Sequence, residues 1–332
     1  MLVSSQHLLF FGLLFLGLIT SVSAPSWFMI WLGLELNLMS FIPLMISKSD
    51  RLSSEAALKY FLVQALSSAF IIMAAPLMVT TSSYKLVILM SLLLKLGAAP
   101  FHFWFPPVME NLSWAKCIIL MTVQKIAPMM LISHLNSGQA SYYLIMISSI
   151  LSAVVGALGG LNQTSLRKIF AFSSINHLSW MLISIILSNH AWMTYFLFYS
   201  TISASLALYF SEQQFLHFSD LFVKKSSKLP LLMYSMAFLS LGGLPPFSGF
   251  IPKWTVMELM ISKDMIFPLL ILILTSVTSL YFYLRLATLP LLLKHTTKKQ
   301  LYTLSTTKFY LTTPILSLNL SLLFIPSIFA LL

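Results

Sequence analysis

The sequence of 332 residues is poor in charge and in cysteine. Only 8% of its residues are charged, whereas 58% are hydrophobic. A water-soluble globule of this length needs far more polar surface, so the composition excludes that class and predicts a polytopic membrane protein. The single cysteine, Cys117, excludes an intrachain disulfide and cannot by itself hold an iron–sulfur cluster or a zinc ion.

Nucleotide-binding and metal-hydrolase motifs are absent as well. The sequence contains no GxGxxG, no Walker loop and no HExxH, so it lacks these phosphate-binding and zinc-binding devices. Its net charge of +11 comes from basic residues scattered over separate loops. Because they form no single patch, we expect no nucleic-acid partner. We also expect no metal and no cofactor in this chain, so any redox chemistry must happen elsewhere.

About eleven apolar stretches are long enough, at roughly 20 residues each, to cross the hydrocarbon core of a membrane. The predicted fold class is therefore all-α, and the whole chain, 1–332, is expected to form a single membrane domain. The predicted spans cover residues 3–23, 25–46, 55–79, 84–106, 112–135, 141–160, 169–188, 191–211, 230–262, 265–289 and 310–332. The stretch 230–262 is too long for one straight span. We expect two half-helices there, around LGGLPPFSGFIPKW (241–254).

An internal repeat relates the two halves of the chain. LKLGAAPFHFWFPP (94–107) aligns without gaps onto LSLGGLPPFSGFIP (239–252), at an offset of 145 residues. Five spans, an odd number, separate the copies, so we expect inverted repeats with a broken helix in each half. The predicted halves are 1–139 and 140–292, and a loop with a C-terminal helix follows over 293–332. Chance similarity between two Gly/Pro-rich helices is the alternative.

The charges in the loops predict an orientation. If Met1 lies on side A, the basic loop residues on side B are Lys85 and Lys263, and many more lie on side A. The side A residues are Lys48, Arg51, Lys116, Arg167, Lys168, Lys224, Lys225, Lys228, Lys294, Lys298, Lys299 and Lys308. By the positive-inside rule, side A is the negative, cytoplasm-like compartment. An odd number of spans then leaves the C-terminus on side B.

Four ionisable residues lie near the middle of apolar, membrane-length stretches: Glu35, Lys95, Lys125 and Lys253. Each costs about 2.5 to 3.5 kcal/mol at a bilayer centre, and such residues usually mark ion pathways. Removing an ionisable group from water favours its neutral form, so buried lysine and glutamate side chains can exchange protons near neutral pH. The structural alternative for Lys95 and Lys125 is a salt bridge with Glu35. For Lys253 it is a position near the membrane interface.

Glu35, Lys95 and Lys125 each lie within about a turn of a carbonyl that a proline four positions further on would free, namely those of Met39, Leu96 and Gln124. A proline in a helix removes the hydrogen bond to the residue four positions back and so frees a carbonyl. A freed carbonyl can bind water or an ammonium group, which favours a hydrated, protonatable site. We expect Glu35 and Lys95 to form an ion pair that can be switched by protonation.

His177 lies in the middle of a predicted span, flanked by serine and asparagine residues. Its unperturbed pKa near 6.5 suits a proton relay between Lys125 and Lys253. A hydrogen-bonded packing histidine is the alternative.

Long motifs around these residues resemble one known family. WLGLELNLMSFIP around Glu35, LKLGAAPFHFWFP around Lys95 and QKIAP around Lys125 closely resemble the chain 2 family of mitochondrial NADH–ubiquinone oxidoreductase. GGLNQTSLRKIFAFSSINH from Gly159 and LSLGGLPPFSGFIPKW, ending near Lys253, continue the match. This family comprises antiporter-like membrane subunits of respiratory complex I. It is more distantly similar to cation/proton antiporters.

The resemblance implies a proton-translocating subunit that couples electron transfer in other subunits to proton movement across the inner mitochondrial membrane. It implies that Glu35 is the family's membrane glutamate, Lys95 its paired lysine, Lys125 its bridging lysine and Lys253 its terminal lysine. FMN, iron–sulfur clusters and ubiquinone are then expected in other subunits. The expected partners are the other membrane subunits of complex I, among them other antiporter-like subunits, and membrane lipids.

Two alternatives stay open, an autonomous cation/proton antiporter and a non-pumping structural scaffold. The broken helices and buried charges favour transport over the scaffold, and the long motifs favour the complex subunit. Under the resemblance, side A is the mitochondrial matrix, which holds the N-terminus, and the C-terminus faces the intermembrane space. The visible repeat aligns Lys95 with Ser240 and Lys253 with Val108, so it predicts a shared scaffold without equivalent lysines.

Overall fold

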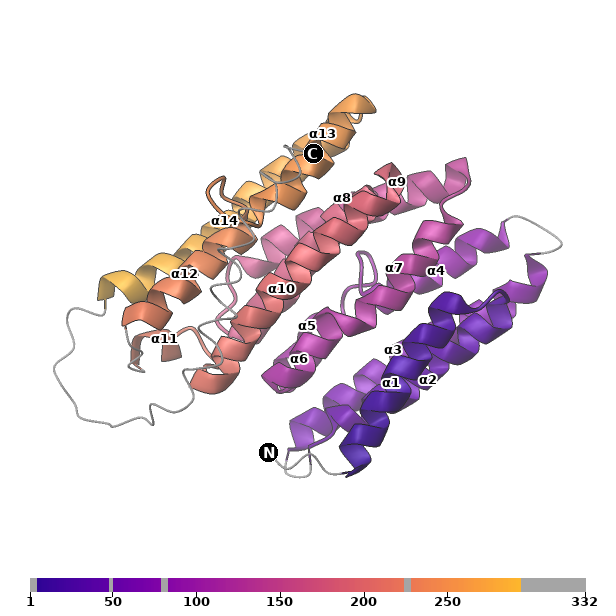
Figure 1. Cartoon of the computed structure of the whole chain (residues 1–332), viewed down its shortest axis with the longest axis horizontal. Helices are drawn as coiled ribbons and strands as arrows, with labels where there is room; N and C mark the ends of the chain where they lie inside the picture. Colours follow the sequence, from indigo (N-terminus) through magenta and orange to yellow (C-terminus); the bar gives the residue numbers. More distant parts are fainter. Residues whose placement is uncertain (1–4, 48–49, 79–82, 224–227, 294–332) are drawn as a thin grey trace. The chain divides into compact units, whose positions relative to one another are not determined.

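A computed structural model describes residues 5–47, 50–78, 83–223 and 228–293. These residues form α-helices, with an isolated β-bridge between Ser165 and His217, which confirms the predicted all-α class for the part described. The chain divides after Ser152 into two compact units, whose helices Figure 1 shows. The predicted boundary between the halves falls at the start of helix α8 (Gln139–Gly160), and the unit boundary falls within it.

The first unit places its helices around α2 and α4. Its elements are α1 (Ser5–Ser23), α2 (Trp27–Met45), α3 (Arg51–Leu77), α4 (Tyr84–Leu96), α5 (Phe105–Asn111), α6 (Trp114–Met121), α7 (Val123–Leu135) and the greater part of α8. Helix α2 starts at Ser26, whose hydroxyl accepts the backbone N–H of Met29, and it continues through Pro43. It packs against α1 and α3, and α4 packs against α3 and α7.

The second unit is built around α9. Its elements are the end of α8, α9 (Leu166–Leu187), α10 (Asn189–Gln213), α11 (Asp220–Val223), α12 (Lys228–Gly242), α13 (Phe250–Ser262) and α14 (Ile266–Leu293). Helix α9 is a central helix, because 89% of its most apolar stretch of 18 residues is buried. It packs against α10, α13 and α14, and α12 packs along α14.

In the described part of the chain, eight helical segments are long and apolar enough to cross a membrane, namely α1, α2, α3, α6 together with α7, α8, α9, α10 and α14. Each matches a predicted span to within a few residues at either end. The predicted span 230–262 is divided into α12 and α13, as expected. The predicted helix 310–332 lies outside the described residues, so the number of eleven spans stays a prediction.

The predicted span 84–106 ends too early. It is divided into α4 and α5, and α5 continues to Asn111. The reason lies in Pro106 and Pro107, which occupy the first positions of α5. A proline there loses no helical hydrogen bond, because the first N–H groups of a helix have no partner within it. These prolines therefore lie at the start of a helix, although the sequence analysis placed the end of a span there.

In each unit, a lysine connects the ends of two helices through a hydrogen bond to a backbone carbonyl. Lys116 Nζ donates to the carbonyl of Met45 at 2.8 Å, which brings the start of α6 to the end of α2. Lys263 Nζ donates to the carbonyl of Leu187 at 2.7 Å, which brings the end of α13 to the end of α9. If successive spans cross the membrane in alternating directions, the start of α6 and the end of α2 lie at the same membrane surface. The same holds for the ends of α13 and α9. Lys263 is thus a helix cap, which gives a structural reason for one of the basic residues predicted on side B.

Candidate functional site

Three of the predicted lysines are buried within their units. The exposed fraction is 7% for Lys95, 2% for Lys125 and 5% for Lys253. Lys95 lies in the last turn of α4, Lys125 in the first turn of α7 and Lys253 in the first turn of α13. Each lysine therefore lies beside a point at which a helix is interrupted.

The first interruption is made at Gly97, which follows α4 with a φ of +70°. Its N–H donates to the carbonyl of Leu94 at 3.1 Å, and the N–H of Ala98 donates to the carbonyl of Leu93, also at 3.1 Å. This pair of bonds is the Schellman arrangement, which needs a left-handed residue after the last helical turn. Glycine adopts that conformation without a steric penalty from Cβ.

Neutral side chains donate further hydrogen bonds to carbonyl groups at the end of α4. Trp104 Nε1 donates to the carbonyl of Leu94 at 3.1 Å, and Gln64 Nε2 donates to the carbonyl of Lys95 at 3.2 Å. The last carbonyls of a helix have no partner inside it, and leaving them unpaired in a buried site costs free energy. The backbone that carries Lys95 is therefore fixed by groups that do not titrate.

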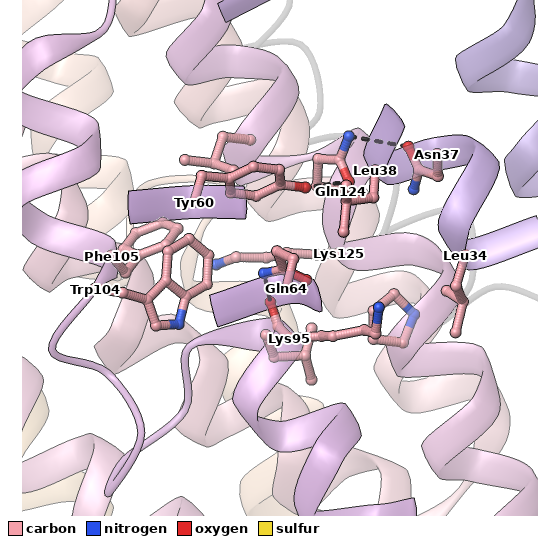
Figure 2. Close-up of a pocket in the computed structure, with 13 residues that line it drawn as sticks. Leu34, Asn37, Leu38, Tyr60, Gln64, Lys95, Trp104, Phe105, Gln124 and Lys125 are labelled. Atoms are coloured by element: carbon pink, nitrogen blue, oxygen red, sulfur yellow. Dashed lines mark hydrogen bonds between the residues drawn. The ribbon is translucent and has the colours of Figure 1, made fainter. Parts of the chain in front are cut away.

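A cavity opens among α2, α3, α4 and α7, and Figure 2 shows its lining. The space that the centre of a water molecule can occupy is about 20 Å³, and one water needs roughly 10 to 15 Å³ measured in this way. The polar lining residues are Asn37, Tyr60, Gln64, Lys95, Gln124 and Lys125. Lys95 and Lys125 thus line one water-sized cavity from two different helices.

Lys125 lies three residues after the interruption between α6 and α7. Thr122 makes that interruption, with φ −114° and ψ −76°, and its Oγ1 donates to the carbonyl of Ile118 at 2.7 Å. Lys125 Nζ lies 5.4 Å from the centre of the Phe105 ring, to which it points in Figure 2. An aromatic face attracts an ammonium group at this distance, so Phe105 helps to hold the charged form of Lys125.

Glu35 lies on α2 and is half-buried. Its carboxylate acts electrostatically on Lys95. A direct ion pair is not formed, because the contacts within 4.0 Å in the described part of the chain include Lys59–Glu55 but not Glu35–Lys95. A pair between Glu35 and Lys95 would therefore need an intervening water or a side-chain movement.

A chain of neutral side chains connects three helices at the cavity. Tyr60 Oη donates to Gln124 Oε1 at 3.3 Å, and Gln124 Nε2 donates to Asn37 Oδ1 at 3.0 Å (Figure 2). Sequence reasoning missed these residues and Gln64, because it searched for charge. The signal was present, since each of the three amides is a polar residue inside an apolar stretch of spanning length.

The second interruption, between α12 and α13, repeats the hydrogen bonds of the first. Gly243 has a φ of +75°. Its N–H donates to the carbonyl of Ser240 at 2.9 Å, and the N–H of Leu244 donates to the carbonyl of Leu239 at 3.4 Å. The helices after the two breaks start at Phe105 and Phe250, which the sequence repeat aligns. The broken-helix part of the repeat is thus present in both units.

Lys253 reaches back across the second break. Its Nζ donates to the carbonyl of Gly242 at 2.9 Å, in a buried bond. Gly242 is the last residue of α12, so its carbonyl lies at the negative end of the helix dipole. The side chain of Lys253 therefore caps α12.

His177 lies on α9 between two tyrosines. Its Nδ1 lies 3.0 Å from Tyr195 Oη, and its Nε2 lies 3.5 Å from Tyr283 Oη. A cavity of about 10 Å³, measured as for the first, lies between His177 and the α12–α13 break. Its polar lining residues are His177, Tyr195, Tyr199 and Ser240. These contacts fit a proton relay and also fit the packing alternative.

The structure thus assembles the predicted residues within each unit. In the first unit, Lys95 and Lys125 line one cavity, and Glu35 lies within electrostatic reach of Lys95. In the second unit, His177 lines a cavity together with residues of the α12–α13 break, and Lys253 donates to the carbonyl of Gly242 at that break. Among the described residues, no group of three or more His, Cys, Asp and Glu side chains is placed to hold a metal ion.

A protein-family model described as "NADH:quinone oxidoreductase/Mrp antiporter, TM" matches residues 24–280. The chain belongs to this family. NADH-ubiquinone oxidoreductase chain 2 of Anopheles gambiae is 47% identical over 290 residues, which cover 84% of each chain. The chain 2 protein of Locusta migratoria is 36% identical over 326 residues, which cover 95% of this chain and 94% of the relative.

The fold of this NADH:quinone oxidoreductase/Mrp antiporter family member is similar to that of a chain in respiratory complex I from Thermus thermophilus. The TM-score is 0.85 at 24% identity, and the match covers 97% of this chain and 78% of that chain. Every candidate site residue, from Glu35 to Lys253, lies inside the region that the family model matches. The resemblance read from the motifs is therefore confirmed.

Proposed function

We propose that this chain is a proton-translocating, antiporter-like core subunit of NADH:ubiquinone oxidoreductase in the mitochondrial inner membrane. Two relatives, at 47% and 36% identity, are named NADH-ubiquinone oxidoreductase chain 2 and match 84% and 95% of this chain. The family description, which joins quinone oxidoreductases and antiporters, supports ion movement as the shared activity. Electron transfer then takes place in other subunits, and this chain moves protons in response.

The observation that carries the proposal is the burial of a lysine beside a helix interruption in each unit. Lys95 and Lys253 are both less than a tenth exposed and lie next to the two breaks. Each buried ammonium group costs about 2.5 to 3.5 kcal/mol at membrane depth, which packing alone does not offset. Broken helices with ionisable groups at their ends are the usual architecture of ion-coupled transport sites. A passive scaffold would need neither feature.

The first cavity gives Lys95 and Lys125 a route by which they can exchange a proton. When one lysine is an ammonium and the other an amine, a water between them can accept a proton from the first and donate one to the second. Charge then moves although no heavy atom is transported. The carboxylate of Glu35 attracts the ammonium group of Lys95 and offsets part of the cost of burying it. In this proposal Lys125 passes the proton on toward Lys253, with His177 as the intermediate carrier.

The chemistry that drives these transfers belongs to the partners. FMN, iron–sulfur clusters and ubiquinone are proposed for other subunits, and the neighbouring membrane subunits, with membrane lipids, are the proposed partners. We propose that the N-terminus lies in the matrix and the C-terminus faces the intermembrane space, an orientation that the basic loops of side A support. Of the side A residues on which this orientation rests, the following lie outside the described residues: Lys48, Lys224, Lys225, Lys294, Lys298, Lys299 and Lys308.

Methionine substitution of the buried lysines tests the proposal, because methionine keeps most of the volume and removes the charge. We expect Lys95→Met, Lys125→Met and Lys253→Met each to reduce ubiquinone reduction by the assembled enzyme. NADH oxidation at the flavin, measured with an artificial electron acceptor, should be unchanged. Lys59→Met is the matched control, because Lys59 is exposed and paired with Glu55. Normal coupled ubiquinone reduction in all three buried variants would refute the proposal.

A further inference from the structure

The α12–α13 break leaves a space beside its glycine that the lysine occupies. A Cβ atom built on Gly243 would lie 2.8 Å from Cδ, 2.9 Å from Nζ and 3.1 Å from Cε of Lys253. Carbon contacts optimise at about 3.5 to 4.0 Å, so a side chain at position 243 would require the end of the Lys253 side chain to shift from its observed position. The Lys253 side chain thus lies along the bare backbone of Gly243 as it reaches Gly242.

We propose that Gly243 is a positioning residue for Lys253, since its missing side chain allows the ammonium group to lie on the carbonyl of Gly242. The inference rests on the proposed role of Lys253 in proton transfer. The positive φ of Gly243 already favours glycine at this place. The contact with Lys253 is a second and separate requirement.

The first break shows that the two requirements are independent. Gly97 has nearly the same φ, +70°, and ends its helix with the same pair of hydrogen bonds. A Cβ atom on Gly97 would meet Phe105 and Trp104 at 3.3 Å, and no lysine atom is among its nearest neighbours. The carbonyls at that helix end are taken by the neutral donors of Gln64 and Trp104. An ionisable cap is thus a property of the second break.

The ionisable cap links the protonation of Lys253 to its position. A charged donor makes a hydrogen bond roughly twice as strong as a neutral one, and the carbonyl end of α12 attracts a cation. Protonated Lys253 is therefore held on Gly242 more firmly than the neutral amine is. Because Gly243 has no side chain, Lys253 Nζ can occupy the position beside the carbonyl of Gly242. The ammonium group therefore gains and loses its proton at that position.

The test compares Gly243→Ala with Gly97→Ala in the assembled enzyme. Both changes put alanine at a positive φ, so they share the backbone strain, and only the first introduces an atom against a lysine. A structure of each variant measures the distance from Lys253 Nζ to the carbonyl oxygen of Gly242. Turnover per flavin and the KM for ubiquinone are measured alongside, with Lys253→Met as the reference.

In Gly243→Ala we expect the contact with Gly242 to be lost and turnover to fall as far as in Lys253→Met, with the KM for ubiquinone unchanged. In Gly97→Ala the contact should persist. If Gly243→Ala does not assemble, Gly243→Asn replaces it, since asparagine tolerates this φ and still carries the Cβ. The proposal is wrong if the contact survives the change at 243, or if turnover survives loss of the contact. Normal turnover in Lys253→Met would instead refute the proposed function on which it rests.

Discussion

At the scale of single residues, burial distinguishes the lysines that we propose to move protons from Lys116 and Lys263. Lys116 and Lys263 are half-buried or exposed and donate to helix ends near the predicted membrane surfaces. Lys95 and Lys125 are buried and line a cavity with room for water. Sequence reasoning found the buried lysines because a charge in an apolar span is conspicuous. It could not pair them, since their distances depend on packing between helices.

The amide of Gln124 should matter for stability more than for proton transfer. Replacing it in Gln124→Leu leaves the Tyr60 hydroxyl and the Asn37 amide without this partner, and each unsatisfied buried group costs about 1 to 3 kcal/mol. We expect faster thermal inactivation of the assembled enzyme, with an unchanged proton-to-electron ratio. Tyr60→Phe removes only the 3.3 Å bond and serves as the milder comparison. Equal inactivation rates in wild type and Gln124→Leu would contradict this reading of the network.

His177 offers a separate test at the residue scale, because a relay must carry a proton and a packing residue need only make hydrogen bonds. Glutamine can replace the hydrogen bonds of the imidazole ring but does not become protonated in the physiological range. We expect His177→Gln to lower coupled ubiquinone reduction. Tyr195→Phe, which removes one hydrogen bond of 3.0 Å to the ring, should lower it less. Full coupled activity in His177→Gln would favour the packing alternative.

At the scale of elements, the breaks of α4–α5 and α12–α13 are the features that the sequence predicted best. Gly97 and Gly243 supply the left-handed residue that ends each first half-helix, and nearby prolines discourage its continuation. The start of α5 was harder to predict, because prolines favour the beginning of a helix as much as they oppose its middle. The cap that Lys253 places on α12 could not be predicted, since it depends on how the chain folds back after the break.

The positive φ of Gly97 predicts a loss of stability when a side chain is added there. A left-handed conformation costs a non-glycine residue about 1 to 2 kcal/mol, so Gly97→Ala should lower the amount of assembled enzyme and its thermal midpoint. Gly12→Ala is the control, since Gly12 lies within α1 and an added Cβ meets no atom within 4 Å. Alanine in a helix is favourable, so this variant should be as stable as wild type or more so. Equal stability of the two variants would argue against strain at the break.

At the scale of the whole molecule, the units of the chain share a broken-helix device and differ in their polar groups. The first surrounds its lysines with amides and an aromatic ring, and the second combines a lysine cap with a histidine between tyrosines. Composition and hydropathy predicted the membrane class and, among about eleven spans, the eight that the described residues contain. The inverted relation of the halves stays a prediction, as does the orientation in the membrane, because charge in loops decides orientation and α-helical packing does not.

Labelling of introduced cysteines tests the orientation. Ser219, before α11, falls on predicted side A, and Ser262, at the end of α13, falls on side B, and both are exposed. The native Cys117 is buried, so it gives little background. In mitoplasts, a membrane-impermeant maleimide should label Ser262→Cys directly and Ser219→Cys only after detergent is added. The reverse pattern would show that the orientation is inverted.

The central claim, that this subunit moves protons through its buried lysines, is tested most directly by counting protons. Purified enzyme carrying Lys125→Met is reconstituted into vesicles, and the protons translocated per second are measured per flavin, with Lys59→Met and wild type beside it. We predict a large loss of proton translocation in Lys125→Met, with flavin-site NADH oxidation intact and Lys59→Met at the wild-type rate. Proton translocation at the wild-type rate in Lys125→Met would contradict the account.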